Sequence, residues 1–472
     1  MKKVRQVATC RTLCSIFDFP LKREAFNPFT LRLSSIIHQL YGTNKQETLL
    51  ITFRYSLIFL PKIMCRMQKM LVTMPPQKNQ IPNSIKGLYT QFFYQVSEIP
   101  DSIFADAAPA NNLFLQKNYR QALEKATPAG IQVCYLVFFK QNQAIGIAAM
   151  QIKDFNAQES IRQAQIAGTW CEKLSNFVKL SLAKHVRFNT LVLGNLLLCG
   201  EHGYWFQPTV SETERNIFIK EGLETAKEYL LKAGIYISAV FVKDFFETNR
   251  PVLFETDGYN PFQVEPNLVF DLPETWVKYD DYLNALSSKY RVRAKRAFKK
   301  AEGLERKVFN EERIQAYLPR LNELYQNIAD AADFNMVSLH PEHQLAQKRA
   351  LGENFQLIGY FVDNQLVAFF TTVKNYDETE ACFLGYDKNF NHEYQIYLNI
   401  LFDIVRIGIE NRSKRIIFAR TASEIKTTVG ARAREMYLYL KHQNPLVNKI
   451  LPKTLPMLSP RLVWEARHPF KE

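Results

Sequence analysis

Residues 383–432 constrain the fold of this chain more than any other stretch, because strand and helix patterns alternate there. One strand pattern ends near Tyr386, a long apolar helix pattern covers residues 393–410, and a second strand pattern covers residues 415–419. In α/β units, ligands bind where strands end and helices begin. We therefore expect a binding site in the polar group that ends the second strand: Arg420, Thr421, Glu424 and Lys426.

The positive charge of the chain is concentrated in two places. The 472 residues include 60 Lys or Arg and 46 Asp or Glu, which gives a formal net charge of +14. Residues 1–70 hold 12 basic and 3 acidic residues, and the stretch from Lys289 to Lys307 holds 9 basic and 2 acidic residues. The remainder is nearly neutral, which disfavours broad contact with nucleic acid.

Residues 1–70 show no steady helix or strand period. Their most apolar piece, residues 49–60, is interrupted by Arg54 and followed by Pro61, so it is too short to span a membrane. Three interpretations stay open: a basic targeting or membrane-surface segment, a poorly ordered extension, or translated sequence upstream of the natural start. We favour the last, because nothing in this irregular basic extension is patterned to pack into a core.

Length and composition indicate a globular chain of more than one domain. A chain of 472 residues exceeds one ordinary domain, and a content of 47% apolar and 13% aromatic residues is typical of folded proteins. The seven cysteines lack the paired spacing of a metal site. We expect no bound metal and a reducing, cytoplasmic location.

An internal repeat accounts for the length. Each copy is expected to contain a helix, a β-hairpin, a further strand, a helix and a last strand. In the first copy these strands and the second helix cover residues 133–139, 144–152, 191–198, 212–232 and 235–242, with a turn at Gln141-Asn142. In the second copy they cover residues 355–362, 366–374, 380–386, 393–410 and 415–419, with a turn at Asp363-Asn364. Two copies of one α+β unit explain the chain better than two unrelated domains.

A basic helix is expected between the copies, over residues 279–300. Tyr282, Leu286, Tyr290 and Ala294 recur at helical spacing and form one apolar stripe. The other faces are basic, so this helix is either a solvated surface or a docking surface for an acidic acyl carrier protein, RNA or an anionic membrane. We divide the chain into the extension (1–70), a first half (88–275), this bridging helix (276–305) and a second half (306–460).

Several segments resemble a known group of enzymes. The run from Tyr282 to Arg291, continuing to residues 296–300, resembles the bridge between the halves of Fem-type transferases, which consist of two GNAT-type acyltransferase folds. Residues 355–364, 380–387 and 418–431 resemble the GNAT-type domain of bacterial peptidoglycan biosynthesis or recognition acyltransferases, and residues 193–203 are similar to a segment of the same group. The resemblance implies an α+β fold of two tandem GNAT-like domains, each a mixed β-sheet flanked by helices.

The resemblance also implies a reaction. It suggests an N-acyltransferase that moves an acyl group from a thioester co-substrate, acyl-CoA or acyl carrier protein, to an amine such as an amino acid, a cell-wall precursor or an amino-lipid base. GNAT enzymes usually cradle the CoA pyrophosphate in a glycine-rich turn, whereas the matching residues 387–394 contain no glycine. Acetyl-CoA is therefore less favoured than longer acyl-CoA or a carrier protein. Two alternatives stay open: an aminoacyl-tRNA-dependent peptidoglycan transferase, and a non-catalytic ligand-binding module.

Four residues are candidates for catalysis. Glu424 is the candidate base, Arg420 the candidate anion-binding group, and Tyr386 the candidate proton donor to a leaving thiolate. Glu424 and Arg420 are equally compatible with a structural ion pair. His202 lies in a Gly-Glu-His-Gly turn after a strand of the first half and titrates near neutral pH, although a structural role competes.

Six residues are candidates for binding the donor. They surround the segment that matches the CoA turn or belong to the polar group after the second strand: Asp387, Lys388, Asn391, Asn399, Thr421 and Lys426. Backbone donors at the start of the following helix can hold an anion without glycines. The acceptor is expected in the cleft between the halves, and a peripheral position at the inner face of a membrane is compatible with the basic helix.

Overall fold

The computed structural model describes residues 87–156, 187–330, 337–458 and 464–471. The chain divides into two compact units, Met1–Gln80 and Ile81–Glu472, and every described residue belongs to the second. The expected extension over residues 1–70 lies outside the described residues. No helix within the described ranges combines the length and the apolar character needed to cross a bilayer.

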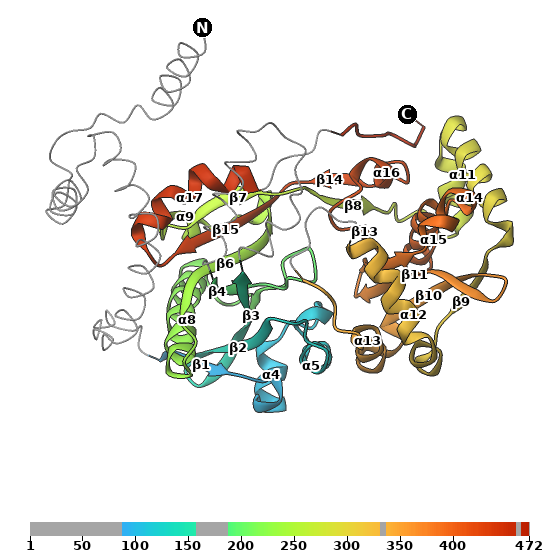
Figure 1. The fold of residues 1–472 in the computed structure, drawn as a ribbon. Coiled ribbons are helices and arrows are strands. Elements are labelled where there is room, and N and C mark those ends of the chain that lie inside the picture. Colours follow the sequence, from blue (N-terminus) through green and yellow to red (C-terminus); the bar gives the residue numbers. More distant parts are fainter. Residues whose placement is uncertain (1–86, 157–186, 331–336, 459–463, 472) are drawn as a thin grey trace, which may run out of the picture. The chain divides into compact units, whose positions relative to one another are not determined.

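The first sheet is mixed and has eight strands. Its main path runs β1-β2-β3-β4-β6-β15-β7, and β5 pairs with β3 (Figure 1). The pair β4–β6 is parallel and the other pairs are antiparallel. The strands are β1 (Leu88–Phe93), β2 (Ile131–Lys140), β3 (Gln143–Asn156), β4 (Arg187–Leu193), β5 (Tyr204–Phe206), β6 (Ile237–Phe246), β7 (Asn260–Gln263) and β15 (Met436–His442).

Helices cover both faces of the first sheet because its central strands are apolar on both sides. On β2, Leu136 and Phe138 pack in the core formed with α8 (Glu212–Lys232), while Val137 and Phe139 pack with α4 (Asp101–Ala107). The expected capping box begins α8: the Glu214 backbone N–H donates to the Ser211 hydroxyl, and the Ser211 N–H donates to the Glu214 carboxylate. The remaining helices near this sheet are α5 (Lys117–Lys125), α9 (Val252–Thr256) and α17 (Pro445–Leu458).

The second sheet is also mixed and has seven strands in the order β14-β8-β13-β12-β11-β10-β9. The strands are β8 (Asn267–Asp271), β9 (Glu305–Val308), β10 (Phe355–Val362), β11 (Gln365–Asn375), β12 (Glu378–Tyr386), β13 (Arg415–Ile417) and β14 (Arg432–Arg434). One face packs on α10 (Tyr279–Ala285), α11 (Ser288–Lys300) and α15 (Ile396–Glu410), and the other on α12 (Glu311–Ala329) and α13 (His343–Leu351). The predicted fold class, two mixed sheets each flanked by helices, is confirmed.

The expected duplication is visible in the hairpins and in the strand order. Gln141 and Asn142 join β2 to β3, and Asp363 and Asn364 join β10 to β11; all four have positive φ, as a two-residue type I′ turn requires. The two sheets also match strand by strand: β1-β2-β3-β4-β6 corresponds to β9-β10-β11-β12-β13, with the parallel pair at the same place.

The two halves exchange one strand each. In the first sheet, β15 from the C-terminal part of the chain lies between β6 and β7; in the second sheet, β8 lies between β13 and β14. Figure 1 shows red β15 beside the green strands of the first sheet. The sequence boundaries at residues 275 and 306 therefore do not separate the sheets, because the residues before 275 supply β8 and those after 306 supply β15.

The bridge is two helices, so the prediction of a single helix over residues 279–300 is wrong. The chain is extended at Leu286 and Ser287, where α10 ends and α11 begins. Arg291 stabilises this break, since its Nη2 donates to the carbonyl oxygens of Asn284 at 3.1 Å and Leu286 at 2.8 Å. The predicted apolar stripe is confirmed, because Tyr282, Leu286 and Ala294 are buried against the second sheet.

The helix expected over residues 393–410 is also divided. A short helix, α14 (Lys388–Tyr394), precedes α15, and Gln395 between them has a left-handed backbone conformation with φ of 48°. The segment that matches the CoA turn is therefore helical. The Nδ2 of Asn399 holds the break by donating to the carbonyl oxygens of Tyr394 and Gln395 and of Ala297 in α11.

Candidate functional site

The parallel strands β12 and β13 separate after a short contact. They pair only at Glu378–Arg415, Thr379–Ile416 and Glu380–Ile417. Beyond that point residues 381–386 have no paired residue in β13, while Phe418 and Ala419 continue to bond with Leu268 of β8. The two strands therefore open toward the end of β12, where Tyr386 lies.

A cavity of about 880 Å³, here called the basic pocket, lies at this open end. Its walls come from five places: Tyr386 at the end of β12, two residues of α14, the start of α15, Ile425 of α16 (Ser423–Thr427), and one side of α11. The volume is within the range of ordinary small-molecule sites. The pocket thus lies where a strand ends and a helix begins, as expected for a ligand site.

The charge of the basic pocket comes from α11. Lys289, Arg293, Arg296 and Lys300 line it and are exposed. Their spacing of four, three and four residues places them on one side of the helix, along about 16 Å of its axis. Within the described ranges none of the four is ion-paired, and Lys300 Nζ donates only to the His392 carbonyl oxygen at 3.3 Å. The pocket is therefore suited to an anion.

Two tyrosines form the inner wall of the basic pocket. The ring centroids of Tyr386 and Tyr397 are 6.1 Å apart. Burial raises the pKa of both phenols, so they keep their protons at neutral pH. The Asn391 side chain also lines the pocket and accepts a hydrogen bond of 2.9 Å from the Tyr397 backbone N–H. Tyr386 and Asn391 are thus the two predicted site residues that lie together in this pocket.

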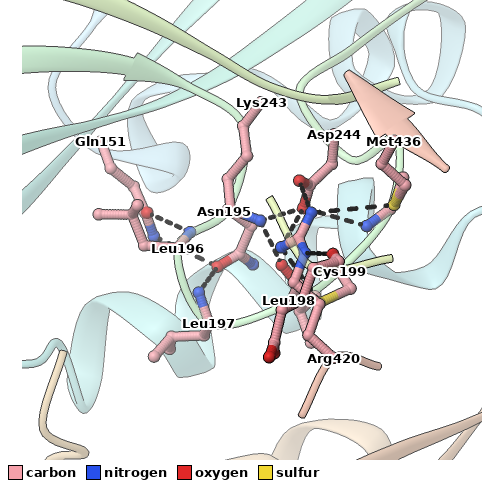
Figure 2. Close-up of polar contacts among 12 residues, drawn as sticks. Gln151, Asn195, Leu196, Leu197, Leu198, Cys199, Lys243, Asp244, Arg420 and Met436 are labelled. Atoms are coloured by element: carbon pink, nitrogen blue, oxygen red, sulfur yellow. Dashed lines mark hydrogen bonds and ion pairs between the residues drawn. The ribbon is translucent and has the colours of Figure 1, made fainter. Parts of the chain in front are cut away.

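Arg420 belongs to a buried ion cluster, which consists of Arg420, Asp244 and Lys243 (Figure 2). Asp244 is fully buried and pairs with both cations; burial raises its pKa, but Lys243 and Arg420 outweigh this and hold it below its ordinary value. Lys243 also donates to the Leu198 carbonyl oxygen at 2.7 Å. The expected partner of Arg420, Glu424, is replaced by Asp244 of the first sheet.

A β-bulge supplies the geometry of the ion cluster. The register of β6 against β15 shifts so that both Lys243 and Asp244 lie between the pairs Val242–Tyr439 and Phe245–Tyr437. Asp244 has a positive φ of 66°, and the bulge directs two successive side chains into the cluster. Because Arg420 follows β13, the cluster links the two halves.

Lys426 stabilises the loop that carries Arg420. Ala419, Thr421 and Ala422 all have positive φ, which is unfavourable for residues with a Cβ atom. The buried Lys426 Nζ donates to the carbonyl oxygens of Phe418 at 2.7 Å and Arg420 at 2.7 Å, and burial lowers its pKa to about 8. Lys426 is therefore occupied by the protein backbone, and Thr421 is exposed beside it.

Glu424 is exposed and paired with the C-terminal segment. Its Oε1 accepts hydrogen bonds from Arg467, the Nε bond being 3.1 Å long. It lines a second cavity rather than the basic pocket. The structural ion pair that competed with the base role is therefore present, although its partner is Arg467 rather than Arg420.

His202 is buried in the first half, away from the basic pocket. Its Nδ1 is 3.3 Å from the Asn112 side-chain nitrogen, and its ring packs on Phe114. Burial, with Arg120 and Lys243 nearby, lowers its pKa to about 3, so it stays neutral. These contacts give His202 a packing role.

The remaining predicted residues do not line the basic pocket. Asp387 begins α14, where its carboxylate accepts from the Asn389 N–H at 3.0 Å and lies 3.6 Å from Arg320. Lys388 is exposed and does not line the basic pocket, and Asn399 is buried at the α14–α15 break.

The four pocket cations of α11 were expected to meet a partner but not to line a cavity with Tyr386. Their spacing in the sequence is the signal that could have shown this.

The described residues contain no group of three or more His, Cys, Asp or Glu side chains that could hold a metal ion. Cys134, Cys199 and Cys382 are free thiols. The side chains that line the basic pocket include exposed cations, two protonated phenols, and the side chains of Asn391, His392 and Gln395.

No protein-family model matches this chain, and no curated protein matches it either. The structure is similar to that of FemX, with a TM-score of 0.47 and 10% identity over 77% of this chain and 100% of that chain. It is also similar to a tandem GNAT protein from the clavulanic acid biosynthesis pathway (TM-score 0.45, 9% identity, 76% and 99% covered) and to L-PGS from Bacillus licheniformis (0.39, 11%, 73% and 96%).

Proposed function

We propose that this protein is an N-acyltransferase that moves an acyl group from a phosphate-bearing thioester, acyl-CoA or acyl carrier protein, to an amine. The observation that carries the proposal is the basic pocket: four exposed cations, none with a carboxylate partner among the residues that the structure describes, at the point where β12 and β13 separate. Phosphate groups are the ligands that such a set of Lys and Arg side chains binds best.

The open strands suit the rest of such a donor. A pantetheine arm is extended and carries amide groups, so it can hydrogen-bond to a strand edge in the manner of an added strand. Residues 381–386 of β12 offer that edge on the side of β13. The arm would run from the phosphates beside α11 toward the separation of the strands, with Tyr386 next to it.

The reaction needs a proton for the leaving group. When the amine nitrogen attacks the thioester carbonyl carbon, the C–N bond forms and the C–S bond breaks, and the departing thiolate needs a proton. Tyr386 lies in the pocket wall as a protonated phenol. We assign to it the role of proton donor, with Asn391 positioning the start of α15 through the Tyr397 N–H.

A thiol-release assay tests the proposal. Acetyl-, hexanoyl- and palmitoyl-CoA, and the same acyl groups on acyl carrier protein, are mixed with lysine or glucosamine, and free thiol is measured. Release with at least one donor should fall at least tenfold in Arg296→Ala and stay unchanged in Lys295→Ala, since Lys295 is exposed on α11 outside the pocket. If the protein binds donors but releases no thiol from any of them, that result would instead support a non-catalytic module.

An aminoacyl-tRNA donor is a second candidate, favoured by the regular spacing of the pocket cations. Lys289, Arg293, Arg296 and Lys300 extend along about 16 Å of helix, which suits several successive phosphates of an RNA 3′ end. Turnover that requires charged tRNA and fails with every thioester would select this donor. The affinity for tRNA should then fall steeply with salt, and the slope should become shallower in Arg296→Ala.

A further inference from the structure

A second cavity of about 470 Å³, here called the acidic cavity, adjoins the basic pocket. Arg293 and Ile425 line both, so the two spaces share a wall. The other side chains that the argument needs are Glu265, Glu424 and Trp464. A ligand in the acidic cavity is therefore separated from one in the basic pocket by the thickness of one or two side chains.

The two carboxylates of the acidic cavity differ in their availability. Glu424 is already paired with Arg467. Glu265 is half-buried between β7 and β8, and within the described ranges its carboxylate forms no ion pair. Its position is fixed through the main chain, because its carbonyl oxygen accepts a hydrogen bond of 3.1 Å from Arg420 Nε. The charge of Glu265 also acts on Arg420 and Lys426, where it favours the protonated forms, but the carboxylate bonds directly to neither of them.

Trp464 gives the acidic cavity a second means of recognising a cation. An indole ring attracts an ammonium group through its π face, and Trp is the strongest side chain in this respect. A carboxylate and an indole in one cavity match a primary ammonium on an apolar stem, since the stem can pack on the ring and on Ile425. Arg293 lines both spaces, but Glu265 and Glu424 give the acidic cavity carboxylates, which the basic pocket lacks.

We propose that the acidic cavity is the subsite for the acceptor, and that the acceptor is a primary amine held by Glu265 and Trp464. This inference rests on the proposed function for the reaction, but not for the binding of the amine. Glu265 takes one proton from the ammonium and passes it to solvent. The amine nitrogen then forms the C–N bond, the C–S bond breaks, and the second nitrogen proton ends on the thiol through Tyr386, so the net products are amide, thiol and one proton.

Binding of the amine can be measured without any donor. The full chain, labelled with ¹⁵N at its four tryptophan indoles, is titrated with n-pentylamine, and Trp464→Phe assigns the Trp464 resonance. We expect n-pentylamine to shift that resonance and n-pentanol, which has the same shape without the charge, to leave it in place. Equal shifts with both compounds, or none with the amine, would overturn the inference.

Variants then identify the carboxylate. Glu265→Gln should weaken n-pentylamine at least tenfold, while Glu274→Gln, an exposed glutamate outside both cavities, should have no effect. The other indole resonances show whether each variant is folded. In the thiol-release assay, Glu265→Gln should raise the KM for the amine at least tenfold and change the donor KM less than twofold. An unchanged amine KM would refute the subsite, whereas absence of thiol release in the unmodified protein would refute only the proposed reaction.

Discussion

Two groups of basic side chains in this molecule differ in what they face. Lys426 and Lys243 are buried and Arg420 is partly buried, and all three face a carboxylate or backbone carbonyl oxygens. The α11 group is exposed along a cavity and has no carboxylate partner within the described ranges: Lys289, Arg293, Arg296 and Lys300. A buried cation can bind a ligand only by giving up contacts that the fold needs. The comparison teaches that the partner of a cation, rather than its place after a strand, separates a structural charge from a binding charge.

Removal of the anion from the ion cluster should have the largest effect. Asp244→Asn leaves Lys243 and Arg420 buried without a counter-charge, which should lower the free energy of unfolding by about 3–5 kcal/mol. Chemical denaturation measures this. The control is Asp271→Asn, which breaks an exposed pair with Arg434 at 2.7 Å and should cost less than about 1 kcal/mol. Equal losses in the two variants would remove the distinction between the groups.

Removal of two pocket cations should affect binding and not stability. In the double variant Arg296→Ala/Lys300→Ala, affinity for CoA should fall by at least about thirtyfold, because charge-assisted hydrogen bonds to phosphate are lost. Calorimetric titration measures the affinity, and denaturation should show an unchanged free energy of unfolding. The matched control, Lys295→Ala/Lys299→Ala, removes two exposed cations of the same helix outside the pocket. A similar loss in the control would assign the effect to overall charge.

Burial near Lys243 should also make the stability of the protein depend on pH through His202. Burial first, then Arg120 and Lys243, lowers the pKa of His202 to about 3, below its value in the unfolded chain. The contribution of neutral His202 to the free energy of unfolding is therefore complete above about pH 6.5 and is lost as the pH falls toward 3. The loss between pH 6.5 and 5 should be about 2 kcal/mol. His202→Gln should flatten this part of the profile. A profile unchanged by the substitution would show that other groups cause the acid sensitivity.

A change in salt concentration should also distinguish the pocket cations from the ion cluster, and its effect should be the smallest of the four. Raising ionic strength from about 50 to 500 mM should weaken CoA binding several-fold, because the pocket cations are exposed to screening. The free energy of unfolding that depends on Asp244 should change less, since buried pairs are screened weakly. Comparing the free energies of unfolding of Asp244→Asn and the unmodified protein at both salt concentrations measures this Asp244-dependent part. A CoA affinity independent of salt would argue against phosphate binding by α11.

The repeated architecture could be predicted from the sequence because its signals are local. The hairpin turns at Gln141-Asn142 and Asp363-Asn364 and the capping box at Ser211 each depend on a few neighbouring residues. The α10–α11 break was missed because no proline or glycine marks it; an extended Ser287 and the side chain of Arg291 produce it instead. Strand exchange was missed for a different reason: β8 and β15 have ordinary apolar patterns that fit either sheet.

The candidate site was predicted in part, again because only its local features can be read from the sequence. Tyr386 and Asn391 line the same pocket because the end of one strand and the short helix after it both border that pocket. The role of Arg420 could not be read locally, since its partner Asp244 is 176 residues away. Likewise, nothing near Glu424 in the sequence indicates that Arg467 neutralises it. Long-range pairing decides which charges remain free, and a single sequence does not display it.

The strand exchange also affects the order in which the protein can be assembled. During synthesis the first sheet lacks its strand between β6 and β7 until the chain has been made through His442, almost the whole length of 472 residues. Until then β6 and β7 present unpaired edges, which are prone to wrong association. Removal of the residues after 430 should thus destabilise the first half, which is synthesised first but lacks β15 without them. We therefore expect the two halves to fold as one unit although they share one repeated architecture.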